Sequence, residues 1–183
     1  PLFLLTAILR EKIATKSSSY NEFKNKNLII WIGENSWPSP YLLDQFLSPT
    51  TCNNYNWFKN CIFIKAPKQT QRIVSALHNL SNKAVFAVII DSSGLSFIET
   101  RKLQLAAQKG SSLGILLRPP WEINLPSTAQ TRWKIQNLKS ETNTLTWSIE
   151  LLKARGLVES LSWYAEFSDE FEQENRLHIL PVS

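Results

Sequence analysis

Two charged residues come directly after apolar segments, and they are the first candidates for chemistry in this chain. Asp91 follows the apolar run 85–90, and Arg118 follows the apolar run 113–117. Helical spacing of apolar residues predicts an amphipathic helix between the two runs, at about 96–109. A strand, helix and strand in this order predict a parallel pair, and ligands of parallel sheets bind where the strands end at their carboxyl side. We therefore expect function near Asp91 and Arg118.

The residues before Asp91 suggest one specific chemistry. Val88, Ile89 and Ile90 followed by Asp91 match a strand whose final carboxylate holds Mg²⁺ beside a bound nucleotide. The alternative is a turn, in which Asp91 and the serines of the segment 92–94 accept hydrogen bonds from free backbone N–H groups. Asp91 is the candidate for nucleotide or metal contact.

The chain lacks the residues that most other catalytic chemistries require. With five glycines, the chain has no glycine-rich phosphate-binding motif and no strained turn for a nucleophilic serine. Its two histidines, His78 and His178, are not spaced as zinc ligands. Cys52 and Cys61 are expected to be reduced thiols; the alternative is one local bridge in a secreted protein. We expect no metal, no cofactor and no enzymatic activity.

Basic residues suggest contact with phosphate groups or with a partner protein. Arg132 and Lys134 alternate with Trp133, so they share one face of a predicted strand, and basic side chains with aromatic neighbours suit nucleic acid. The alternative is a solvated sheet face whose cations pair with Glu150 and Glu141. The candidate residues for binding DNA or a partner are Arg101, Lys102, Gln104, Arg118, Arg132, Lys134, Lys153 and Arg155.

Apolar patterns in the first 120 residues alternate between the periods of strands and helices. This alternation predicts an α/β core with a mostly parallel sheet flanked by helices. Strands are expected at 28–32, 61–64, 85–90 and 113–117, and helices at 1–13, 41–47, 69–80 and 96–109, the last one stopped by Gly110.

The character of the chain changes after Pro119-Pro120. Four segments then have the composition of antiparallel strands, and on the second of them Lys153 and Arg155 are expected to share a face. We expect one domain, 1–183, with a parallel core at 1–120 and an antiparallel extension with a terminal hairpin at 128–183. The four segments are 131–135, 144–153, 161–167 and 176–180.

Composition limits the class of protein. The chain has 183 residues, 43% of them hydrophobic and 19% charged, which is typical of a globular protein. A net charge of +5 permits contact with nucleic acid without requiring it. No apolar run is as long as a membrane span needs, so no membrane contact is expected. The chain has no methionine and begins with Pro1, so we expect it to begin inside a longer gene product.

Several segments together resemble the ImuA family, RecA-like accessory factors of damage-induced mutagenesis. Their order and spacing are kept over nearly the whole chain. They are Trp31-Ile32-Gly33 with the 38–40 segment, the helix Thr100-Arg101-Lys102-Leu103-Gln104-Leu105-Ala106-Ala107, Leu116-Leu117-Arg118, Thr131-Arg132-Trp133, the strand from Trp147 through Glu150-Leu151-Leu152-Lys153-Ala154-Arg155-Gly156, and the terminal pieces 163–166 and 176–181.

The resemblance implies a three-layer RecA-like core, and a phosphate loop, if there is one, just before Pro1. The chain departs from the family at Lys102, where a second arginine is frequent. The implied function is that of a non-catalytic SOS-response protein of the bacterial cytoplasm, which binds RecA or the polymerase-like ImuB to support translesion synthesis, with possible contact to DNA. Two alternatives stay open. One is a cell-division inhibitor like SulA, which is similar around 114–119, and the other is a RecA-like ATPase.

Overall fold

The computed structural model describes residues 28–34, 37–39, 57–139, 145–167 and 177–181. The chain divides into two compact units, residues 1–128 and residues 129–183. The expected helices at 1–13 and 41–47 lie outside the described residues.

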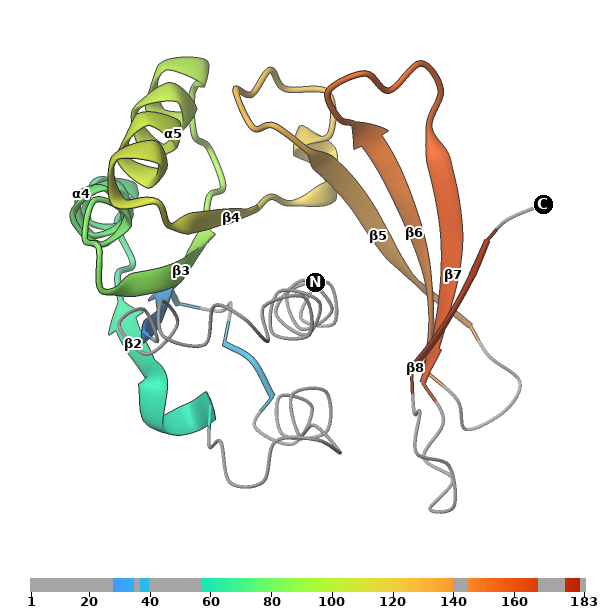
Figure 1. Cartoon of the computed structure of the whole chain (residues 1–183), viewed down its shortest axis with the longest axis horizontal. Helices are drawn as coiled ribbons and strands as arrows, with labels where there is room; N and C mark the ends of the chain where they lie inside the picture. The colour runs from blue at the N-terminus through green and yellow to red at the C-terminus, as the bar shows by residue number, and fades with distance from the viewer. Residues whose placement is uncertain (1–27, 35–36, 40–56, 140–144, 168–176, 182–183) are drawn as a thin grey trace, which may run out of the picture. The chain divides into compact units, whose positions relative to one another are not determined.

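The first unit contains a four-stranded sheet in which all neighbouring strands are parallel (Figure 1). The strand order is β2-β1-β3-β4, which places β1 and β3 in the centre. Their residues are almost all apolar and buried, as strands covered on both faces require. The predicted parallel sheet is confirmed. Its strands are β1 (Leu28–Gly33), β2 (Cys61–Lys65), β3 (Val85–Asp91) and β4 (Leu113–Leu117).

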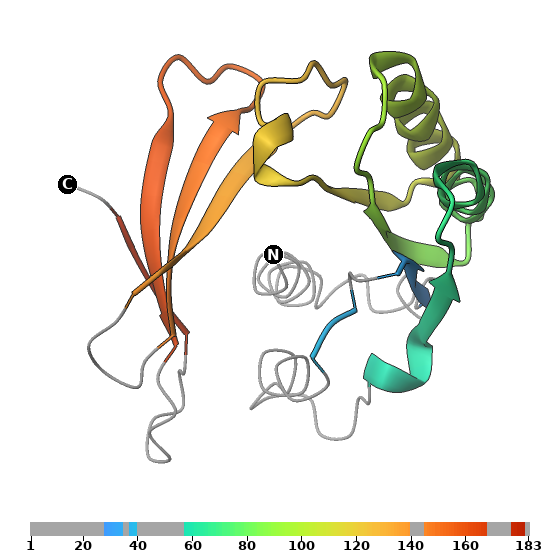
Figure 2. The ribbon, with the colours of Figure 1, turned by 180° about the vertical axis from the view of Figure 1, so that it is seen from behind.

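Two helices, α4 (Gln69–Leu80) and α5 (Phe97–Gly110), lie side by side on one face of this sheet. Both ribbon views show them together (Figures 1 and 2). Because β2, β3 and β4 follow one another through these helices, the connections α4 and α5 cover the same face. Their apolar stripes form one cluster with the sheet, made of Ile30, Ile32, Ala66, Ala76, Leu80, Val85, Val88, Ile90, Leu95, Leu103 and Ala106.

The opposite face of the sheet carries a second buried cluster. It consists of Ile29, Trp31, Phe86, Ala87 and Ile89. Phe86 and Ala87 are consecutive and yet belong to the same cluster, because the register of β1 and β3 shifts between Leu28 and Ile29. One residue of β1 there faces two of β3, which is the geometry of a β-bulge. Both faces of the central strands are therefore buried.

Specific local contacts and backbone conformations fix where helix α5 begins and ends. At its N-terminus, Ser96 and Glu99 form a capping box: the Ser96 N–H donates to Glu99 Oε2 at 2.7 Å, and the Glu99 N–H donates to Ser96 Oγ at 3.3 Å. At its C-terminus, Ser111 takes the left-handed conformation with φ 51°. Gly110 was expected to stop the helix, but it is the last helical residue, with a φ outside the left-handed range, and Ser111 takes the capping position. Its missing Cβ lets the backbone of α5 approach the Leu80 carbonyl of α4.

The second unit is a four-stranded antiparallel sheet with its strands in chain order. This order and direction confirm the predicted antiparallel strands. Trp133 and Trp163 lie on one face with ring centroids 6.0 Å apart, while Lys134 pairs with Glu150 on the other. The strands are β5 (Arg132–Leu138), β6 (Leu145–Lys153), β7 (Leu161–Phe167) and β8 (Leu177–Pro181).

We predict that Gly110→Ala destabilises the first unit. An added Cβ would lie 1.9 Å from the Leu80 carbonyl oxygen, so one helix has to move. The expected loss in the free energy of unfolding is at least about 2 kcal/mol, measured by urea denaturation. Gly114→Ala is the matched control, because its Cβ would lie 3.5 Å from the Leu80 side chain and should change stability by less than about 1 kcal/mol. Equal stability of the two variants would contradict the close contact of the helices.

We also predict that Glu99 makes stability depend on pH in the acid range. The Ser96 N–H, and next the Ser96 hydroxyl, lower the pKa of Glu99 from its ordinary value of 4.5. The cap therefore contributes fully above pH 4.5, and its contribution is lost as the pH falls through the lower folded value. Glu99→Gln should lose less stability than the natural chain between pH 6 and 3, measured by thermal unfolding. A Glu159→Gln control in an exposed loop should behave like the natural chain, and identical acid profiles for all three proteins would refute the role of the cap.

Candidate functional site

The carboxyl end of the parallel sheet brings the two first candidates together. Asp91 ends β3 and is in register with Leu117, the last residue of β4, and Arg118 follows directly. The sequence therefore located both residues at the same edge. The loop between β3 and α5, residues 92–96, begins here, and its Ser92 donates from both N–H and hydroxyl to the Leu117 carbonyl at 2.9 and 2.8 Å.

Both carboxylate oxygens of Asp91 contact protein groups. Its Oδ2 lies 3.3 Å from Nη1 of Arg72 on α4, and its Oδ1 accepts from the Ser93 N–H at 3.2 Å. Both side chains of the ion pair are largely buried. A carboxylate that holds Mg²⁺ needs free oxygens, whereas these bind a guanidinium and a turn. The geometry thus favours the turn interpretation of Asp91 over metal contact. Within the described ranges no cluster of three or more His, Cys, Asp or Glu side chains could hold a metal ion.

Arg118 is directed inward. Its Nη2 donates to the Leu95 carbonyl at 2.7 Å, and its Nη1 lies 3.8 Å from Oε2 of Glu122. Glu122 is buried and Arg118 is largely buried. A guanidinium held in this way positions the β3–α5 loop and is not presented to an external phosphate group.

Glu122 is the residue at this edge that sequence reasoning missed. It lies in the short 3₁₀ helix η2 (Pro120–Glu122) and is 7% exposed. Its Oε1 accepts from the Gly94 N–H at 2.7 Å and lies 3.5 Å from Ser93 Oγ. The carboxylate therefore occupies the place where the backbone of the loop would bind an anion. The only sequence signal is the spacing of four residues from Arg118, which becomes meaningful once the loop is known to lie beside it.

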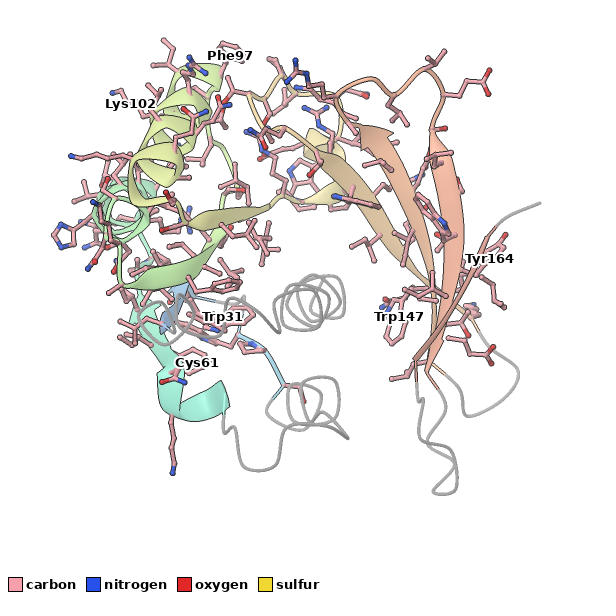
Figure 3. The ribbon with its side chains drawn as sticks, in the orientation of Figure 1. Trp31, Cys61, Phe97, Lys102, Trp147 and Tyr164 are labelled. Atoms are coloured by element: carbon pink, nitrogen blue, oxygen red, sulfur yellow. The ribbon has the colours of Figure 1, made fainter. Side chains whose placement is uncertain are left out.

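The candidates on α5 are on the surface. Arg101, Lys102 and Leu105 are exposed, and Gln104 is half-buried. Arg101 Nη1 donates to Gln104 Oε1 at 2.7 Å along the helix. Figure 3 labels Phe97 and Lys102 on this helix, where both side chains extend outward. These residues form a surface distinct from the sheet edge.

The remaining candidates belong to the second unit. Lys134 Nζ lies 3.5 Å from Glu150 Oε2, so the ion pair with Glu150 that a solvated sheet face predicts is present. Arg132 is in register with Lys153 across β5 and β6. β6 ends at Lys153, and Arg155 lies in the turn that follows, so the expectation that these two share a strand face is wrong. The predicted segment 144–153 ends at Lys153 as β6 does, so a shared face would need the strand alternation to continue past that end to Arg155.

Two potentially reactive side chains have ordinary surroundings. Cys61 is half-buried at the start of β2, and burial raises the pKa of its thiol, which keeps it protonated and weakly nucleophilic at neutral pH. His78 is exposed on α4. Cys52 lies outside the described residues, and so does the side chain of His178.

A scan against protein-family models and a search of curated proteins found no match to this chain. Neither of the two helices described, α4 and α5, has the length and apolar character that crossing a membrane requires.

We predict that Glu122 stabilises the first unit through the β3–α5 loop. In Glu122→Ala, the Gly94 N–H loses its acceptor and the Arg118 guanidinium loses its ion-pair partner, which should lower the free energy of unfolding by about 2–4 kcal/mol. Glu122→Gln retains an acceptor for Gly94 and should lose less. Glu159→Ala, on an exposed loop, serves as the control in the same urea titration. A Glu122→Ala protein within about 0.5 kcal/mol of the control would refute this role.

Proposed function

We propose that this protein is a non-catalytic accessory factor of the bacterial SOS response, which binds RecA or an ImuB-like polymerase relative and so supports translesion DNA synthesis. The proposal starts from the resemblance to the ImuA family. The segments that carry the resemblance coincide with defined elements: Thr100–Ala107 lies in α5, Leu116–Arg118 closes β4, and the Trp147–Gly156 segment is most of β6 with its turn. The parallel sheet with helices, followed by an antiparallel sheet, agrees in kind with the RecA-like core that we propose for the fold.

The observation that carries the proposal is that side chains of the protein itself occupy the carboxyl edge of the parallel sheet. In a nucleotide-hydrolysing protein of this class, a carboxylate at the end of a strand orients Mg²⁺ beside the phosphates. Here Asp91 is held by Arg72 and Ser93, and Glu122 fills the loop beside it. Freeing this edge would require breaking two largely buried ion pairs, which is costly once one partner is left alone. The edge therefore supports a role in binding other proteins through surfaces, without a nucleotide cycle at Asp91.

Binding to RecA and ImuB tests this function directly. The full chain should sediment with RecA filaments formed on single-stranded DNA, or be retained by immobilised ImuB, and should leave ATP unhydrolysed in the absence of RecA. Asp91→Asn should retain binding, because Asp91 is assigned to the fold and not to a metal.

Other outcomes decide against the proposal. Absence of binding to both proteins, with unchanged RecA filaments, would refute it. Filamentous growth on overexpression in cells lacking ImuB would favour the division inhibitor. ATP hydrolysis that is lost in Asp91→Asn would favour the ATPase.

A further inference from the structure

The outward face of α5 combines apolar and basic side chains in one surface. Phe97, Ile98 and Leu105 are 51%, 67% and 49% exposed, which is unusual for three large apolar residues on one helix of a globular unit. Ile98 and Leu105 are seven residues apart and therefore lie on the same line of the helix. We call this surface the α5 face; it consists of Phe97, Ile98, Arg101, Lys102, Leu105, Gln108 and Lys109, all of them exposed.

The charges of the α5 face all have the same sign. Its charged members are Arg101, Lys102 and Lys109, and it contains no acidic residue. The one acidic residue of the helix, Glu99, is used in the N-terminal cap, where the Ser96 N–H donates to it at 2.7 Å. Glu99 also interacts electrostatically with Lys102, but the net charge of the α5 face is positive, and a partner that covers the apolar residues would bring its own groups next to that charge.

A neighbouring segment extends the apolar part of this end of the unit. Trp121 is 80% exposed and Leu125 is 44% exposed. The segment that carries them is attached beside the start of α5 at two points: Glu122 accepts from the Gly94 N–H at 2.7 Å, and the Thr128 N–H donates to Thr100 Oγ1 at 3.4 Å. Aromatic residues held on a fixed backbone are typical anchors of protein interfaces.

We propose that the α5 face docks an acidic amphipathic helix of a partner protein. Such a helix would place its apolar residues against Ile98 and Leu105 and its carboxylates beside Arg101, Lys102 and Lys109. Pairs of helices use this arrangement, with an apolar seam flanked by complementary charges that select the partner. The inference rests on the proposed function in one respect, namely that the protein acts by binding another protein.

The pattern of the α5 face argues against an anionic membrane surface and against single-stranded nucleic acid, the two other polyanions that a basic helix can bind. Helices that lie in a membrane surface separate their apolar and charged faces, whereas here Arg101 and Lys102 lie on either side of the line through Ile98 and Leu105. Rolling the helix cannot separate them, because its inner residues Leu103 and Ala106 are part of the core. Single-stranded nucleic acid gains its contacts from flat aromatic rings and cations, and the aliphatic Ile98 and Leu105 would remain uncovered.

Fluorescence anisotropy with a designed peptide tests the inference. The probe is a labelled helical peptide as long as α5, with leucine on one face and glutamate beside it; the counter-probe carries lysine in place of glutamate. The full chain should bind the acidic peptide at least about tenfold more tightly than the basic one. Arg101→Glu/Lys102→Glu should abolish this preference, and Ile98→Ser/Leu105→Ser should weaken acidic-peptide binding by at least about fivefold.

Matched variants separate the α5 face from general surface effects. Val74 on α4 is 66% exposed, close to the value for Ile98, so Val74→Ser controls for the loss of an exposed apolar residue. Lys83→Glu, in the turn after α4, controls for a charge reversal outside the α5 face. Both should bind the acidic peptide like the natural chain. No binding of the acidic peptide, or the same loss in the controls, would overturn the inference.

Two further probes and the natural partners complete the test. If vesicles of phosphatidylglycerol and phosphatidylcholine, or single-stranded DNA, bind more tightly than the acidic peptide and lose binding in Arg101→Glu/Lys102→Glu, the protein partner is refuted. If RecA or ImuB binds the natural chain and the α5 variants equally, the proposed function stands and the α5 inference fails. If the acidic peptide binds as expected while neither RecA nor ImuB does, the α5 face stands and the proposed function fails.

Discussion

The burial of both faces of β1 and β3 is the constraint on which the first unit depends. The two strands are almost wholly apolar, so each face needs a cover, and the α4–α5 pair supplies one of these covers. The cover works only if the two helices come close, and Gly110 allows this at the Leu80 carbonyl. Once the strands are parallel and covered, their carboxyl ends, and with them Asp91 and Arg118, meet at one edge.

That edge is closed by groups of the chain itself. Parallel strands end in loops whose backbone N–H groups face a shared space, and in many α/β proteins a ligand occupies this space. In this protein a glutamate from the next segment occupies part of it, and two arginines neutralise the two carboxylates. Ion pairs of this kind add little to net stability, because desolvation offsets the attraction between the charges. Their effect is to keep the loops in one defined arrangement. A defined loop arrangement in turn keeps the start of α5 in place.

The position of α5 connects the fold to the proposed role. Its inner stripe belongs to the core and cannot change without loss of stability, whereas its outer stripe is free of that constraint and carries apolar and basic residues together. A surface helix of a protein without partners would normally be polar on that side. A rigid helix with an exposed mixed face suits docking of another protein, as expected for an accessory factor.

The sequence by itself determined the elements and their types. Long apolar runs and helical spacing predicted the four parallel strands, the helices at 69–80 and 96–109 and the four antiparallel strands, because burial and backbone periodicity are local properties of the chain. Tertiary structure alone decided which charged side chains contact which partners. Arg72 and Asp91 are 19 residues apart and Gly94 and Glu122 are 28 apart, and no periodic pattern links such pairs. The packing of α4 against β3, and of η2 against the β3–α5 loop, brings them within hydrogen-bond distance. The closed edge, and the exposed face that remains on α5, therefore exist only in the folded chain.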